Sequence, residues 1–147
     1  MKDVALKDVD AVLNVNVKAP VIATQAAIPH LGRGGRVINI GSWFGEQVQW
    51  PGLAVYAMSK SALSSLTRGL ARELGAEGIT VNLVQPGAIN TDMNPDNGPT
   101  SDAIRGLIPS GQFGTGDDIA QAVAFLASEK AQYITGTALT VDGGMIA

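Results

Sequence analysis

Three side chains in this sequence have the types and spacing needed for proton transfer: Ser42, Tyr56 and Lys60. Tyr56 and Lys60 are four residues apart, so on a helix they share one face. A phenol ordinarily ionises near pKa ~10, and a neighbouring ammonium favours the phenolate. Such a pair exchanges a proton with an alcohol or carbonyl, while a serine hydroxyl holds the same oxygen. Simpler interpretations exist, because helical surface pairs are common and a serine after a strand often forms a turn or a cap.

An alternation of helices and strands would bring these side chains together. The hydrophobic periodicity and the glycine-rich breaks predict helices over 8–31, 56–75 and 115–128, and strands over 36–40, 79–84 and 137–141. This order is typical of an α/β fold with a parallel sheet. Ligands bind at the carboxyl ends of parallel strands. Because Ser42 follows the first strand and Pro86-Gly87 follows the second, we expect Ser42, Tyr56, Lys60 and this turn to line one crevice.

The stretch 90–116 is polar and rich in glycine and proline, with a weak helical centre near 103–108. Segments of this kind usually act as functional lids or are disordered. Trp43, Trp50 and Met93 are candidates for the wall of a substrate pocket. For the two tryptophans, covering the end of the sheet is an equally open interpretation.

Composition excludes several classes of function. The chain of 147 residues is 46% hydrophobic with a net charge of −3, which predicts one globular domain over 1–147. The acidic balance argues against nucleic acid and anionic membranes as partners. No cysteine and one histidine argue against a metal site. We find no apolar run near the ~18 residues of a membrane helix and no signal peptide, so we expect a cytoplasmic protein.

Five stretches, taken in order, resemble the carboxyl-terminal half of the short-chain dehydrogenase/reductase family. They are Val15-Asn16-Val17-Lys18, Gly35 through Ser42, Tyr56 through Leu63, Val81 through Gly87 with Thr91, and Gly136 through Gly144. The resemblance implies a Rossmann-like parallel sheet, truncated here to about three strands. It also implies an NAD- or NADP-dependent oxidoreductase that interconverts an alcohol and a ketone.

The same resemblance implies roles for individual residues. Asn16, Ser42, Tyr56 and Lys60 would form a catalytic tetrad. Six residues would hold the cofactor: Tyr56, Lys60, Pro86, Gly87, Ile89 and Thr91. Tyr56 and Lys60 thus belong to both groups. The interval from Ser42 to Tyr56 is one residue longer than the family's usual spacing, which implies a slightly different loop.

Asn16 also has an interpretation that rests on the sequence alone. Pro20 lacks an N–H, so the Asn16 carbonyl four residues earlier loses its helical partner. We expect a kink there, with the freed oxygen holding a water that relays protons from Lys60. An ordinary proline kink with a solvated carbonyl is the alternative.

A glycine-rich phosphate turn after a strand is not found in this sequence, so we expect the chain alone to bind a dinucleotide weakly. Three functions stay open: the catalytic half of an oxidoreductase, a non-catalytic oligomerisation or ligand-binding module, and a proton-transfer enzyme without a dinucleotide. The apolar faces of helices 8–31 and 56–75 predict a homodimer or a higher homo-oligomer.

Overall fold

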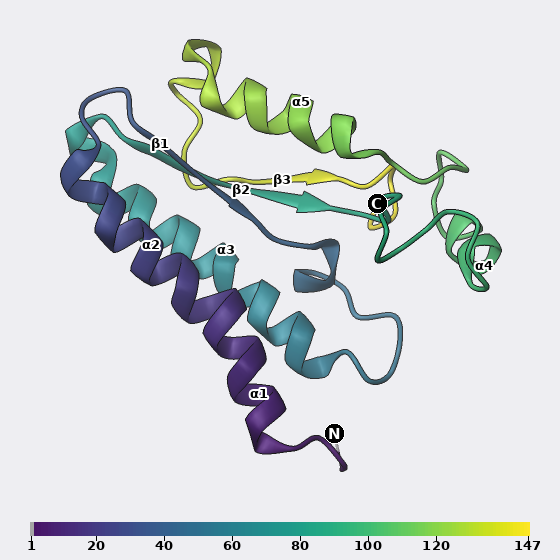
Figure 1. Ribbon diagram of the computed structural model, residues 1–147. Coiled ribbons are helices and arrows are strands. Elements are labelled where there is room, and N and C mark those ends of the chain that lie inside the picture. The colour runs from purple at the N-terminus through teal and green to yellow at the C-terminus, as the bar shows by residue number, and fades with distance from the viewer. Residues whose placement is uncertain (1) are drawn as a thin grey trace.

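Three parallel strands form the centre of the computed structural model, which describes residues 2–147 (Figure 1). The strands are β1 (Arg36–Ile40), β2 (Thr80–Pro86) and β3 (Ala138–Val141), in the order β1-β2-β3. Ile40 lies beside Val84, and Pro86 lies beside Val141. The predicted α/β fold with a Rossmann-like parallel sheet is therefore confirmed.

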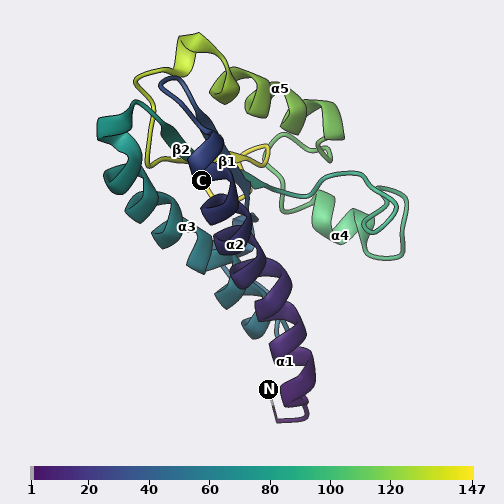
Figure 2. The same cartoon turned by 60° about the vertical axis from the view of Figure 1, so that its left-hand side comes forward.

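Helices lie on both faces of this sheet. Figures 1 and 2 show one long helical segment and α3 on one face and α5 on the other, with α4 beyond the carboxyl ends of the strands. Their bounds are α1 (Leu6–Leu13), α2 (Ala19–Ala27), α3 (Ala54–Leu74), α4 (Ser101–Arg105) and α5 (Gly116–Ala127). The sheet and its two helical layers thus set the direction in which each connecting loop must leave.

Strand β2 carries the core of the molecule. Val81 packs with Ala71 and Leu74 of α3, whereas Val84 packs with Leu126 of α5. A strand that buries both faces has an almost continuous apolar run rather than a strict alternation. The residues after Pro86 are therefore held at a fixed place between the two helical layers.

The elements differ from the predicted bounds by a few residues. Strand β2 continues to Pro86 because Gln85 and Pro86 still pair with Thr140 and Val141 of β3. Helix α3 begins at Ala54 rather than at residue 56. Thr115 and Asp118 form a capping box at the start of α5. The stretch 90–116 contains α4, and Ile89 and Gly114 form a parallel bridge at its base.

A π-helical turn, Asn14–Lys18, lies between α1 and α2, just before Pro20, where the sequence predicts a kink. The Ala19 N–H bonds to the carbonyl of Asn14, five residues earlier. A π turn accommodates a local disturbance of the regular helical bonding without ending the helix. Helical structure therefore runs without a break from Leu6 to His30.

This long segment corrects the expectation that the sequence holds no stretch suited to a membrane. Residues Leu6–His30 form 25 residues of helix, and an 18-residue window within them has a mean hydropathy of 1.2. By length and composition alone, this one described helix could cross a membrane. Few charged residues interrupt its small apolar side chains, which raises the mean. Core helices of soluble proteins and signal sequences meet the same criterion.

The outer edge of β1 is open within residues 2–147, because β2 is the one strand paired with it there. Ile40, at the end of β1, is 46% exposed. A parallel strand normally has neighbours on both sides, so this edge offers unpaired backbone groups to a further strand.

Two buried serines of α3 provide a test of how the helices are joined. The Ser59 hydroxyl donates to the Tyr56 carbonyl oxygen (2.6 Å) and accepts from Asn16 Nδ2 (3.0 Å). The buried Ser64 hydroxyl has no partner among the described residues. We expect Ser59→Ala to lower the free energy of unfolding by about 1–3 kcal/mol and Ser64→Ala to leave it nearly unchanged. Urea denaturation measures both, and equal effects would contradict the expectation.

Candidate active site

The carboxyl ends of the three strands form the floor of the candidate site. Gly41 and Ser42 follow β1, Gly87 follows β2 and Asp142 follows β3. The Gly87 N–H donates to the Val141 carbonyl (2.9 Å), and a Cβ on Gly87 would lie 2.5 Å from Cα of Asp142. The small side chain of Gly87 therefore allows the ends of β2 and β3 to meet.

Ser42 is buried at the start of a short 3₁₀ turn, Trp43–Gly45. Its Oγ accepts a hydrogen bond from the backbone N–H of Phe44 (3.3 Å). The capping function that serines often have after a strand is thus present here. This hydrogen bond holds the hydroxyl at the edge of the sheet, where Ser42 lines two cavities.

Tyr56 and Lys60 reach this edge from the first two turns of α3. Lys60 Nζ donates to the Ile40 carbonyl at the end of β1 (3.2 Å) and lies 5.9 Å from the centre of the Tyr56 ring. Partial burial lowers the pKa of Lys60 from its usual 10.5, because desolvation disfavours the ammonium. The expected proximity of phenol and ammonium is therefore present in the structure.

Asn16 contacts the same helix through its side chain. Its Nδ2 donates to Ser59, and Ser59 donates to the carbonyl of Tyr56. This connection joins the π-helical turn to the turn of α3 that carries Tyr56. Sequence reasoning assigned a role to the Asn16 carbonyl and missed Ser59. The available signal for Ser59 is its place one residue before Lys60 on the same helix.

A cavity of about 410 Å³ opens at the strand ends, and we call it the edge cavity. Two members of the predicted tetrad, Ser42 and Tyr56, line this cavity. Four further residues that are expected to hold a cofactor line it as well: Pro86, Gly87, Ile89 and Thr91. Thr91 also caps a turn, because its Oγ1 accepts from the Asn94 N–H (3.2 Å). Asn94 lines the cavity as well and was not predicted.

A second cavity of about 500 Å³ adjoins the first, and we call it the aromatic cavity. Trp43, Trp50 and Met93, the predicted substrate-facing residues, all line it. Trp43 is also part of a core cluster with Ala88, Ile108, Phe113 and Met145. The exposed fraction of Met93 is 96%, which puts this side chain at the rim. Ser42, Tyr56, Gly87 and Asn94 line both cavities.

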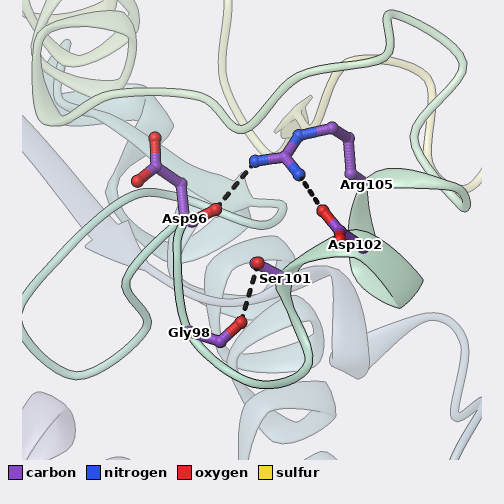
Figure 3. A network of polar contacts seen from close by, with 5 residues as sticks. All are labelled: Asp96, Gly98, Ser101, Asp102 and Arg105. Carbon is purple, nitrogen blue, oxygen red and sulfur yellow. Dashed lines mark hydrogen bonds and ion pairs between the residues drawn. The ribbon is translucent and has the colours of Figure 1, made fainter.

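The segment above the aromatic cavity is held by one arginine. Figure 3 shows Arg105 of α4 directed at Asp96 and Asp102, while Ser101 donates to the Gly98 carbonyl. Arg105 donates to the Asp96 carbonyl (2.7 Å) and forms an ion pair with Asp102 (2.6 Å). Its guanidinium also lies over the Phe113 ring, 5.7 Å from the centre. For this stretch the sequence predicts either a lid or disorder, and it does not identify Arg105 as the residue that holds the segment together.

The lining of the edge cavity suits the nicotinamide end of a dinucleotide. It combines the apolar side chains of Pro86, Ile89 and Ile119 with the polar side chains of Thr91 and Asn94, which match a flat ring that carries an amide. Lys60 lies one helical turn after Tyr56. Among residues 2–147, no glycine-rich turn leads from a strand into a helix to receive a pyrophosphate. The described residues therefore fit one end of the cofactor.

The lowered pKa of Lys60 predicts a specific dependence on pH. Because the folded pKa lies below the unfolded value of 10.5, the unfolded chain binds more protons between these two values. The contribution of Lys60 to stability therefore becomes more favourable as the pH rises from the folded pKa to 10.5. NMR of ¹³C-methylated lysines checks this, with the Lys60 signal identified by its loss in Lys60→Arg. A titration midpoint at or above 10.5 would contradict it.

Comparison with known proteins places this site in a family. The model of a family described as "Enoyl-(Acyl carrier protein) reductase" matches residues 1–146. A "3-oxoacyl-[acyl-carrier-protein] reductase FabG" of Rickettsia bellii is 46% identical over 143 residues, which cover 95% of this chain and 59% of that protein. A "Cyclic-di-GMP-binding biofilm dispersal mediator protein" of Escherichia coli is 43% identical, with coverage of 92% and 57%.

Solved structures agree. A short-chain dehydrogenase of Burkholderia cenocepacia in complex with NADP superimposes with a TM-score of 0.98 at 49% identity. The match covers 100% of this chain and 60% of that one. The chain thus spans about 60% of the length of the relatives that it matches. From the family model, the relatives and the shared fold, this chain belongs to the short-chain dehydrogenase/reductase family.

Proposed function

We propose that this chain carries the catalytic part of an NAD(P)-dependent oxidoreductase that interconverts an alcohol and a ketone. One observation carries the proposal: Ser42 and Tyr56 line the same cavities at the sheet edge, with the Lys60 ammonium 5.9 Å from the Tyr56 ring. The family supports the reaction class, and the Burkholderia relative, named as an NADP complex, supports the cofactor class. A nicotinamide, when bound, supplies or accepts the hydride.

The chain's own residues perform the proton chemistry in this proposal. During ketone reduction the Tyr56 hydroxyl gives its proton to the substrate oxygen, and during alcohol oxidation the phenolate takes it back. The nearby Lys60 ammonium stabilises the phenolate. The Ser42 hydroxyl donates to the same substrate oxygen and orients it. Asn16 positions this turn of α3 through Ser59.

The proposal is tested with a chimera. The part of the Burkholderia enzyme that lies outside the match, about 40% of its chain, is joined to this chain in the order of that enzyme. We expect the chimera to reduce a ketone with NADH or NADPH, and Tyr56→Phe to lower kcat by about 10²–10⁴-fold. Tyr133→Phe is the control, since Tyr133 is 99% exposed. An inactive but folded chimera that binds the cofactor would contradict the proposal and favour a non-catalytic module.

We also propose that a second copy of the chain covers the apolar outer face of α1–α3 in a soluble, cytoplasmic homodimer. Five large apolar side chains of this helical layer are exposed: Leu6, Val15, Val21, Ile22 and Met58. Lys18 interrupts the long helix near its middle, which disfavours burial in lipid. The Burkholderia structure matches the whole chain, this helix included.

Charge placed on this face should separate the two copies. We expect the wild-type chain to sediment as a dimer at micromolar concentration and Ile22→Glu to sediment as a monomer, because a carboxylate would be buried without a partner. Val48→Glu is the matched control: Val48 is 54% exposed and Ile22 is 52% exposed, but Val48 lies in the loop before α3. A monomeric wild-type chain, or a dimeric Ile22→Glu variant, would overturn the proposal.

A further inference from the structure

The aromatic cavity has a polar end and an apolar body. Its polar groups, Ser42, Tyr56 and Asn94, lie where it meets the edge cavity. The apolar wall is formed by Trp43, Phe44, Trp50, Leu53, Ile104 and Met145. A substrate whose oxygen is held by Ser42 and Tyr56 therefore places the rest of its structure against apolar side chains. The volume of about 500 Å³ is within the range of small-molecule pockets.

Four aromatic rings are packed at one side of this cavity. The Trp43 and Phe44 rings are stacked with centres 4.2 Å apart, and Trp50 meets Trp43 edge-on at 5.7 Å. Phe44 contacts Trp50 and Tyr56 edge-on, at 5.6 and 6.1 Å. Rings so arranged offer both faces and edges to a further ring, and aromatic pairs prefer these geometries. The wall therefore favours a planar aromatic group over a saturated group of similar size.

Among residues 2–147, none that line the aromatic cavity carries a positive charge. The cations nearest to it along the chain are already engaged. Lys60 donates to the Ile40 carbonyl, and Arg105 is directed at Asp96 and Asp102 (Figure 3). A carboxylate or phosphate in this cavity would lose its hydration without gaining a counter-ion. The cavity therefore disfavours anionic substrates such as nucleotides.

From these observations we infer that the substrate of this site is an uncharged carbonyl compound or alcohol that carries an aromatic ring. The inference rests on the proposed oxidoreductase function and narrows it to one substrate class. The substrate oxygen lies between Ser42 and Tyr56, and its ring lies against Trp43, Phe44 and Trp50. The tryptophans, two in the whole sequence, both line the cavity, so their fluorescence reports binding directly.

The test compares three alcohols by tryptophan fluorescence: 1-phenylethanol, 1-cyclohexylethanol and 4-(1-hydroxyethyl)benzoate. We expect 1-phenylethanol to bind at least about tenfold more tightly than the benzoate, because the carboxylate is desolvated without a partner. We expect the cyclohexyl alcohol to bind more weakly than the phenyl alcohol. In Trp50→Leu this second preference should shrink, with Trp43 as the remaining reporter. Equal or tighter binding of the benzoate or of the cyclohexyl alcohol overturns the inference.

A gain-of-binding variant keeps the test independent of misfolding. Met93→Lys places an ammonium at the exposed rim and should tighten benzoate binding about tenfold, whereas Val48→Lys, outside the cavity, should not. No gain in Met93→Lys counts against the inference.

The chimera separates the two proposals. Selective binding of 1-phenylethanol without Tyr56-dependent turnover overturns the oxidoreductase function, whereas turnover of the charged analogue as readily as the neutral one overturns the substrate class.

Discussion

Parallel pairing of the three strands is the constraint on which the rest of the structure depends. It brings every carboxyl end to one edge, so residues far apart in the sequence meet there without further devices. The buried side chains of β2 hold that edge between two helical layers. Ser42 and Gly87 are placed by strand ends, and Tyr56 arrives on the helix that must begin where β1 leaves the sheet.

The position of α3 relative to this edge is set by polar contacts as well as by packing. Lys60 reaches the last carbonyl of β1, and Ser59 joins the turn of Tyr56 to Asn16. Each contact joins two elements. Apolar packing alone would also allow α3 to shift slightly along its own axis relative to these elements. These bonds select one alignment, which is what a site for proton transfer requires. The contacts of Asn16, Ser59 and Lys60 thus fix the first turns of α3 relative to the strand ends.

The strand order, the helix that carries Tyr56 and Lys60, and the turn after β2 could be predicted because each has a local signal. The signals are apolar periodicity, a four-residue spacing and the pair Pro86-Gly87. The contacts of Ser59 and Arg105 could not be predicted, because both depend on partners brought close by the tertiary fold. The extent of β2 was missed for a related reason, since its last two residues are strand through pairing with β3. The π turn before Pro20 could not be predicted either, because the periodicity of the sequence does not reveal it.

That π turn fixes the phase of the helix on either side of it. A turn closed by i→i+5 bonds contains about one residue more than an α turn, and each residue of an α-helix advances the chain by roughly 100° around the axis. The π turn therefore completes one circle around the axis with about one residue more than an α turn uses, so α1 and α2 keep the phase of one continuous helix although the stretch Asn14–Lys18 holds an extra residue. Leu6 thus stays on the side of the molecule where a regular helix would place it, and the extra residue alters only the local turn that carries Asn16.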